Sequence, residues 1–152
     1  MKLNNPIYSY RQDPEIPPFP DDGPVAVMDA HCAICARGAR WIAHNDSEGE
    51  FTIVPLQSEL GNALMRHYAM DPDDPLSWLY LQEGKGYTSL DAAIRVGQRL
   101  GGVWRGLVVL RVFPLIVQDW LYGLVARNRI RLGGTADLCN MPDAEVQKRL
   151  LS

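Results

Sequence analysis

The chain of 152 residues has only three cysteines, no block of basic residues and no long uninterrupted apolar run. Three cysteines are too few for a small fold held together by disulfides. The net charge of −3 gives no reason to expect a nucleic-acid partner. The most apolar stretch is residues 103–126. Four polar or charged residues interrupt it, so no uninterrupted apolar run is long enough to span a bilayer: Arg105, Arg111, Gln118 and Asp119.

The N-terminus also lacks the apolar run of a secretory signal, so we expect a cytoplasmic protein. It carries instead six of the eleven prolines, all within residues 1–24. Proline fixes φ and removes a backbone donor, so residues 1–23 are predicted to form an extended arm outside regular elements. Four apolar side chains would lay this arm over the domain: Ile7, Tyr8, Tyr10 and Phe19.

The order of predicted elements in residues 24–102 indicates one α/β domain. Residues 24–29 and 51–56 are short apolar strands, and the helical spacing between them predicts a parallel βαβ unit. A helix capped by Ser58 follows, then two antiparallel strands around a turn at residues 83–86. A last helix is stopped by Gly101 and Gly102. The order β-α-β, α, β-β-α is the thioredoxin-like arrangement.

Residues 103–152 are predicted to form a helical extension packed on this core. Its second helix begins at Pro114, a residue suited to the first helical turn. An apolar stripe on that helix is expected to be buried against the core, and it comprises Val117, Trp120, Leu121, Leu124 and Val125. Arginines follow at the C-terminal end of the helix, where cations complement the helix dipole: Arg127, Arg129 and Arg131.

Cys32 and Cys35 are separated by two residues at the junction of the first strand and the first helix. Unpaired N–H groups and the helix dipole favour a thiolate at such an N-terminus. We therefore expect Cys32 to be the exposed attacking thiol and Cys35 the shielded resolving thiol. The alternatives are chance spacing and a metal site. A zinc site needs about four ligands, and Cys139, His31, His44 and His67 are scattered.

Two neighbours of the pair are candidates for supporting roles. His31 directly precedes Cys32 and, when protonated, would stabilise its thiolate, or it is simply exposed. Asp29 ends the first strand. Its carboxylate would relay the proton of the buried thiol, or it would cap the helix and satisfy loop amides. The sequence leaves these alternatives open. Cys139 lies beyond the last long helix and is not expected to be the resolving partner.

Four segments in a fixed order carry a resemblance to a known family: MDAHCAIC, PLQSELG, YTSLDAAIRV and YGLVARNRIRLGG. Together they resemble the DCC family of thiol-disulfide oxidoreductases, over roughly residues 24 to 150. By this resemblance Asp29, Cys32 and Cys35 match the motif that names the family. Other positions fall in recurring segments of the family: Gln57, Ser89, Asp91, Ala92, Tyr122, Arg127, Asn128 and Arg129.

One residue departs from the family pattern. Ala30 stands where the family usually has glycine after the aspartate. If that position required a positive φ, alanine would cost about 1 kcal/mol.

The thioredoxin-like arrangement draws attention to Pro75, which stands just before the predicted third strand. Redox proteins of this kind commonly place a cis-proline there, beside the cysteine pair, where its backbone pairs with an extended substrate. A trans proline that ends the acidic turn at residues 71–74 fits the local sequence as well.

The leading hypothesis is a thiol-disulfide oxidoreductase that needs no cofactor and acts on a disulfide- or thiol-bearing protein or small molecule. The second is a non-enzymatic interaction module, in which a thioredoxin-like domain docks its basic, apolar C-terminal helices on a partner or a membrane surface. The third is a metal-binding protein.

Overall fold

The computed structural model describes residues 5–73, 78–128, 131, 134–135 and 137–151. Its sheet has the strand order β2-β1-β3-β4. The strands are β1 (Val25–Met28), β2 (Thr52–Pro55), β3 (Leu79–Gln82) and β4 (Lys85–Thr88). β1 and β2 are parallel, whereas β1 with β3 and β3 with β4 are antiparallel. The parallel pair and the hairpin predicted from the sequence are confirmed, and the fold is thioredoxin-like.

The helices that follow β1, β2 and β4 lie in the predicted places along the chain. Ser58 caps the helix after β2 as expected, because its Oγ accepts a hydrogen bond of 3.0 Å from the backbone N–H of Gly61. Gly101 and Gly102, both with positive φ, end the helix after β4. The described helices are η1 (Ser9–Gln12), α1 (Ala33–Asn45), α2 (Glu59–His67), α3 (Ser89–Leu100), η2 (Gly102–Val112), α4 (Leu115–Arg127) and α6 (Ala144–Gln147).

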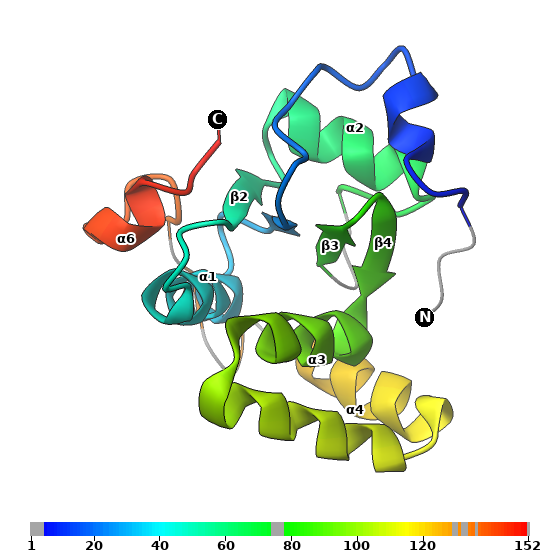
Figure 1. The fold of residues 1–152 in the computed structure, drawn as a ribbon, viewed down its shortest axis with the longest axis vertical. Coiled ribbons are helices and arrows are strands. Elements are labelled where there is room, and N and C mark those ends of the chain that lie inside the picture. Colours follow the sequence, from blue (N-terminus) through cyan, green and yellow to red (C-terminus); the bar gives the residue numbers. More distant parts are fainter. Residues whose placement is uncertain (1–4, 74–77, 129–130, 132–133, 136, 152) are drawn as a thin grey trace.

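Helices cover both faces of the sheet, and alternate strand residues therefore supply two cores (Figure 1). On one face Ala26 and Tyr80 pack with apolar residues of α1 and α3, among them Ile42 and Val96. On the other face the partners come from α2 and the N-terminal arm. That second cluster includes Val25, Val27, Val54, Leu60, Leu64, Leu79 and Tyr10.

The N-terminal arm lies over α2, but it is not extended throughout as predicted. Residues 9–12 form the short 3₁₀ helix η1, whose Tyr10 is buried. Ile7, expected to pack on the domain, is exposed. The imidazole of His67, at the end of α2, lies between two arm residues, with Nε2 2.7 Å from Ser9 Oγ and Nδ1 2.7 Å from Asp13 Oδ2. These contacts fasten the arm to α2.

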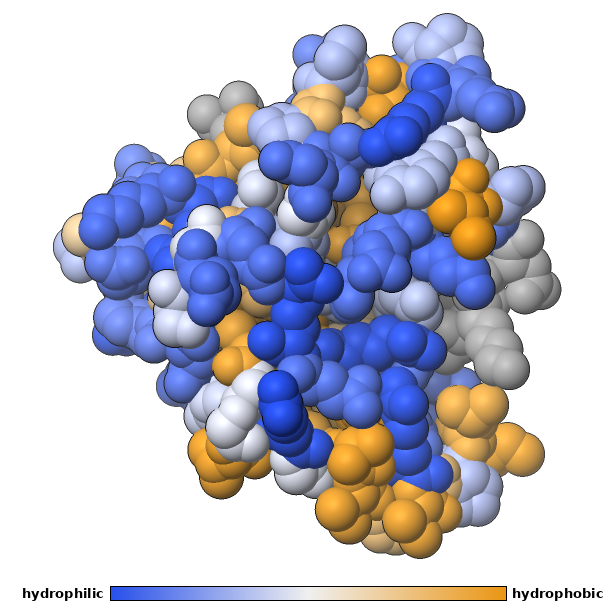
Figure 2. Space-filling view, in the orientation of Figure 1, coloured by the Kyte–Doolittle hydropathy of each residue, from blue (hydrophilic) through white to orange (hydrophobic). Residues whose placement is uncertain are grey.

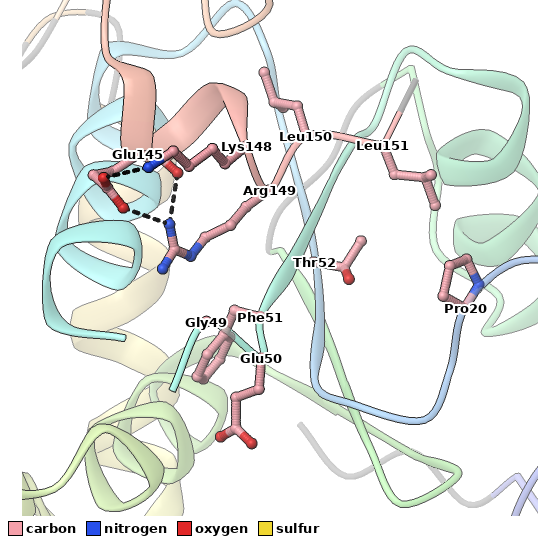
Figure 3. A pocket seen from close by; sticks show the side chains of 10 residues that line it. All are labelled: Pro20, Gly49, Glu50, Phe51, Thr52, Glu145, Lys148, Arg149, Leu150 and Leu151. Carbon is pink, nitrogen blue, oxygen red and sulfur yellow. Dashed lines mark hydrogen bonds and ion pairs between the residues drawn. The ribbon is translucent and has the colours of Figure 1, made fainter. Parts of the chain in front are cut away.

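The C-terminal residues return to the sheet and pair with its β2 edge. The N–H of Ile53 donates to the carbonyl of Arg149, and the N–H of Leu151 donates to the carbonyl of Ile53. A cavity of about 460 Å³ lies beside this edge (Figure 3). Lys148 and Arg149 both bind Glu145 at its rim. Neither Cys32 nor Cys35 is among the described residues that line it.

Residues 102–127 form two helical elements, as expected, but the first is a 3₁₀ helix and the second is not buried along its stripe. Val117, Trp120, Leu121, Leu124 and Val125 are all exposed, so the prediction that they pack against the core is wrong. Instead η2 packs closely on α3 at Gly97. A Cβ at this position would lie only 2.8 Å from the carbonyl oxygen of Trp104, so there is no room for a side chain. None of the described helices is by itself long and apolar enough to cross a membrane. η2 and α4 pass that test only together, and they meet at an angle of 116°.

Candidate active site

Cys32 occupies the N-cap of α1, as the sequence predicts. Its φ of −97° and ψ of 122° are extended, and its carbonyl accepts the first helical hydrogen bond, of 2.9 Å, from the N–H of Ala36. The strand ends at Met28, so only residues 29–31 separate β1 from this cap. The Cys32 sulfur therefore lies where the N-terminal amides of a 13-residue helix are concentrated.

The loop before Cys32 is fixed by the side chains of Asp29 and Gln57. Asp29 Oδ1 accepts hydrogen bonds from the N–H of His31, at 2.9 Å, and from Gln57 Nε2, at 2.8 Å. Gln57 Oε1 accepts one from the N–H of Ala30, at 3.0 Å. The structural alternative for Asp29, that it satisfies loop amides, is thus confirmed. Its catalytic role stays a prediction.

A distant segment, residues 134, 135, 137 and 138, covers this loop, and we call it the cover segment. The backbone of Cys32 forms an isolated antiparallel bridge with Thr135. The N–H of Leu138 donates a 2.8 Å hydrogen bond to the carbonyl of Ala30, and the Leu138 side chain is fully buried. A longer contact, 3.4 Å, joins the N–H of Ala33 to the carbonyl of Gly134.

The cover segment reverses the predicted accessibility of the two thiols. Cys32 is 0% exposed, whereas Cys35 is only partly buried against the α1–α3 core. The prediction that Cys32 is the exposed thiol of the pair is therefore wrong. Its helix position was correct, but the pairing with Thr135 closes the approach to it. All three cysteines are free thiols, and Cys139, next to Leu138, is exposed.

Cys35 is held in its protonated form. Burial, and after it negative charge on Cys32, raises the pKa of the Cys35 thiol to about 12. The Cys35 thiol also donates a hydrogen bond to Cys32, so the two sulfurs lie close together. The Asp29 carboxylate adds to the rise, and the backbone of Asp29 opposes it. A pair arranged in this way keeps Cys35 neutral near pH 7.

His31 is exposed. Hydrogen bonds from Asn140 lower the pKa of the Asp137 carboxyl, and the charge of His31 contributes in the same direction. His31 thus interacts with an acidic residue of the cover segment. Its action on the Cys32 thiolate stays a prediction.

The remaining predicted site residues are Pro75, Arg127 and Arg129. Pro75 and Arg129 lie outside the described residues, so the proposed substrate platform at Pro75 stays a prediction. Arg127 ends α4 and is exposed. Ala30 is buried and does not have a positive φ, so replacing the family's glycine imposes no backbone strain of that kind here. Across the part of the chain that the structure describes, no three His, Cys, Asp or Glu side chains gather as metal ligands.

A family model for DCC1-like thiol-disulfide oxidoreductases matches residues 26–135, from β1 to the cover segment. The chain belongs to this family. The match contains both cysteines of the pair and also Thr135, which covers Cys32. The DCC1-like family name supports a redox role for the dithiol.

Two relatives extend this DCC1-like assignment. The chain is 32% identical over 127 residues to the uncharacterized protein YuxK of Bacillus subtilis (strain 168), covering 84% of this chain and 93% of that protein. It is 28% identical over 122 residues to a chloroplastic DCC family protein of Arabidopsis thaliana, covering 80% of this chain and 71% of that protein. No solved structure matches the chain.

Two parts of the DCC1-like site were not assigned a role from the sequence. Gln57 could have been found, because it follows β2 at the same sheet edge where Asp29 follows the parallel β1. Thr135 and Leu138 carry no local feature that points to the cysteines, since they lie one hundred or more positions away in the chain.

Proposed function

We propose that this protein is a thiol-disulfide oxidoreductase in which Cys32 is the nucleophile and Cys35 the resolving thiol. The observation that carries the proposal is the position of Cys32 at the N-cap of α1, with Cys35 one turn further along the same helix. Attack on a disulfide requires a thiolate. With a pKa near 12, Cys35 is almost entirely protonated at neutral pH, so Cys32 is the sulfur that attacks.

The exposure of the two residues favours Cys35 instead, since Cys32 is fully buried and Cys35 is not. The cover segment reconciles this with attack by Cys32. Cys32 becomes reachable when its backbone bridge to Thr135 opens. The contact between the cover segment and α1 is weak. The Ala33 N–H lies 3.4 Å from the carbonyl oxygen of Gly134, at the limit of a hydrogen bond. An extended substrate segment that replaced Thr135 would pair with the same backbone groups of Cys32.

In the first chemical step the Cys32 thiolate attacks one sulfur of the substrate disulfide. A Cys32–substrate bond forms, the substrate S–S bond breaks, and the departing sulfur takes a proton from solvent. Cys32 then carries no negative charge. Because that charge is the second largest cause of the raised pKa of Cys35, its removal lowers this pKa.

In the second step Cys35 loses its proton and attacks Cys32. The intramolecular disulfide forms and the second substrate thiolate leaves, so the substrate gains the two electrons that the dithiol loses. The Asp29 carboxylate, which interacts electrostatically with Cys35, is the proposed acceptor of its proton. A second dithiol, of protein or small-molecule class, returns the pair to its reduced form.

The test is reduction of a disulfide-linked peptide by the full chain, with single-turnover analysis of each step. Cys32→Ser should abolish the reaction, and Cys35→Ser should accumulate a mixed disulfide at Cys32. Asp29→Asn keeps an oxygen for His31 N–H and Gln57 but removes the charge, so it should slow resolution more than attack. A trapped mixed disulfide at Cys35 instead of Cys32 would reverse the roles, and unaltered turnover in Cys32→Ser would end the proposal.

A further inference from the structure

Exposed apolar side chains gather on one part of the molecule, residues 102–127, which we call the η2–α4 hairpin. Twelve of the thirteen large apolar side chains exposed among the described residues belong to it, and Ile7 is the exception. In Figure 2 apolar side chains crowd the lower end of the molecule, where Figure 1 places η2 and α4 beneath α3. A patch of this kind on a folded domain indicates a surface that binds something apolar.

Exposure at the tip of the hairpin is not confined to one side. Val112 is 81% exposed and Ile116 is 83% exposed, with Phe113 between them exposed as well. Leu115, Ile116 and Val117 are consecutive, all exposed, and point in directions about 100° apart around the helix axis. A protein partner covers one face of a helix, whereas lipid surrounds an inserted tip on every side.

Two carbonyl groups at the tip accept hydrogen bonds from within the hairpin. Gln118 is buried, and its Nε2 donates to the carbonyl of Leu110, at 3.2 Å, and to that of Phe113, at 2.7 Å. The N–H of Phe113 donates to Leu110, and Pro114 has no N–H to satisfy. Lipid offers no hydrogen bonds, so a segment that enters it must pair its polar backbone groups internally.

The charge of the hairpin is opposite in sign to that of the chain. It carries three arginines, Arg105, Arg111 and Arg127, and one acidic residue, Asp119, within a chain of net charge −3. Asp119 interacts with another group of the chain, and Arg111 pairs with Asp91 of α3 at 3.4 Å. Arg105 and Arg127 are exposed and complement the negative surface of an anionic bilayer.

The dimensions of the hairpin favour partial insertion. η2 has 11 residues and α4 has 13, and the two are inclined at 116°. Their lengths are about 22 Å and 20 Å at the rises of 3₁₀ and α-helices, less than the ~30 Å of a hydrocarbon core. Trp120, exposed on α4, is a residue that favours the lipid–water interface.

We propose that the η2–α4 hairpin binds the surface of an anionic lipid bilayer by inserting its apolar tip into one leaflet. Lipid then covers the faces turned away from α3, while the arginines contact anionic headgroups. The dithiol is not needed for this contact, so the proposal does not depend on the redox chemistry above.

The test is flotation of the full chain with vesicles of phosphatidylcholine, with or without phosphatidylglycerol. Wild-type protein should float with the anionic vesicles, and less so as salt is raised. Ile116→Glu should lower partitioning by about 10- to 100-fold, the change expected when one buried Ile side chain is withdrawn from lipid. Ile7→Glu replaces an exposed apolar residue outside the hairpin and should leave partitioning unchanged.

Three results would overturn the proposal. The first is failure of wild-type protein to float with anionic vesicles, and the second is equal flotation with neutral ones. The third is a wild-type dimer that Ile116→Glu converts to a monomer without any vesicle binding, since the hairpin would then pack against a second copy. Circular dichroism of both variants checks that each remains folded.

Discussion

Cys32 and Thr135 are paired backbone to backbone, although 103 positions separate them in the chain. This bridge, with the hydrogen bond from Leu138 to Ala30, covers the sulfur that is predicted to attack. The reactivity of Cys32 should therefore depend on how tightly the cover segment is held, not only on the helix that bears the thiol.

Leu138→Ala should make Cys32 react faster with an alkylating reagent. The Leu138 side chain is fully buried, so its truncation weakens the docking of the cover segment. We expect about a tenfold increase in the rate, equivalent to ~1.4 kcal/mol less free energy of local opening. Mass spectrometry of partly labelled protein measures the rate at each cysteine. Val146→Ala truncates another fully buried residue, in α6, and should leave Cys32 slow. Equal acceleration in the two variants would show global rather than local opening.

Cys32→Ser should lower the pKa of Cys35. Burial, the largest cause of the pKa near 12, remains, but the charge of Cys32 is lost. The pH dependence of Cys35 alkylation, measured in a Cys139→Ser background, gives both values. An unchanged pKa would mean that Cys32 carries no charge that Cys35 senses.

The same raised pKa affects stability in alkali. An acid whose pKa is higher in the folded state stabilises the fold below its unfolded pKa of ~8.5, and this contribution is lost as pH rises toward 12. Burial acts in the same direction on Tyr68, whose pKa is raised to about 12. Urea unfolding at a series of pH values should show stability falling above pH ~8.5, and falling less steeply in Tyr68→Phe. A decline of the same steepness in that variant would exclude a contribution from Tyr68.

Acid should release the N-terminal arm from α2. The hydrogen bond from His67 lowers the pKa of the Asp13 carboxyl below its usual value. A lowered folded pKa contributes stability above the unfolded pKa of ~3.9, and the contribution is lost as pH falls through the folded pKa. Limited pepsin digestion should therefore cleave the arm more rapidly at a pH below the folded pKa of Asp13 than at a pH near ~3.9.

Asp13→Asn should already be cleaved faster than wild type near pH ~3.9, with little further change as the pH is lowered. A pH profile like that of the wild type would exclude a role for the pair of His67 and Asp13.

Arg149→Met should destabilise the whole fold. Arg149 Nε lies 2.9 Å from Asp46 Oδ2, and both side chains are buried. Removing one partner of a buried ion pair costs about 3–5 kcal/mol, because the other charge stays buried. Urea denaturation measures the change in the free energy of unfolding. Arg99→Met breaks a more exposed pair with Glu50 and should cost about 0–1 kcal/mol. Similar losses in the two variants would contradict the role assigned to burial.

Local features of the sequence predicted most of the fold. The apolar runs at residues 24–29 and 51–56 became β1 and β2, and Ser58 capped α2, because these signals act within a few residues. The helix N-terminus at Cys32 was predicted for the same reason. The cover of Cys32 was not, since pairing with Thr135 is tertiary and nothing near either residue indicates it.

The apolar stripe of α4 shows a second limit of prediction from the sequence. Its spacing is that of a buried helix face, yet Val117, Trp120 and Leu121 are exposed. Periodicity records where apolar side chains point, and it does not tell whether protein or another medium lies against them. The sequence also did not predict that η2 is a 3₁₀ helix and not an α-helix, because the sequence signals for these two helix types are alike at this length.

The pairing of Cys32 with Thr135 also sets an order of events during synthesis. A chain grows from its N-terminus at about 5–20 residues per second. Thr135 is made 103 residues after Cys32, so each new chain carries the thiol without its cover for about 5–20 s. Once Asn45 has been made α1 can form, but the partner that shields its first thiol does not yet exist.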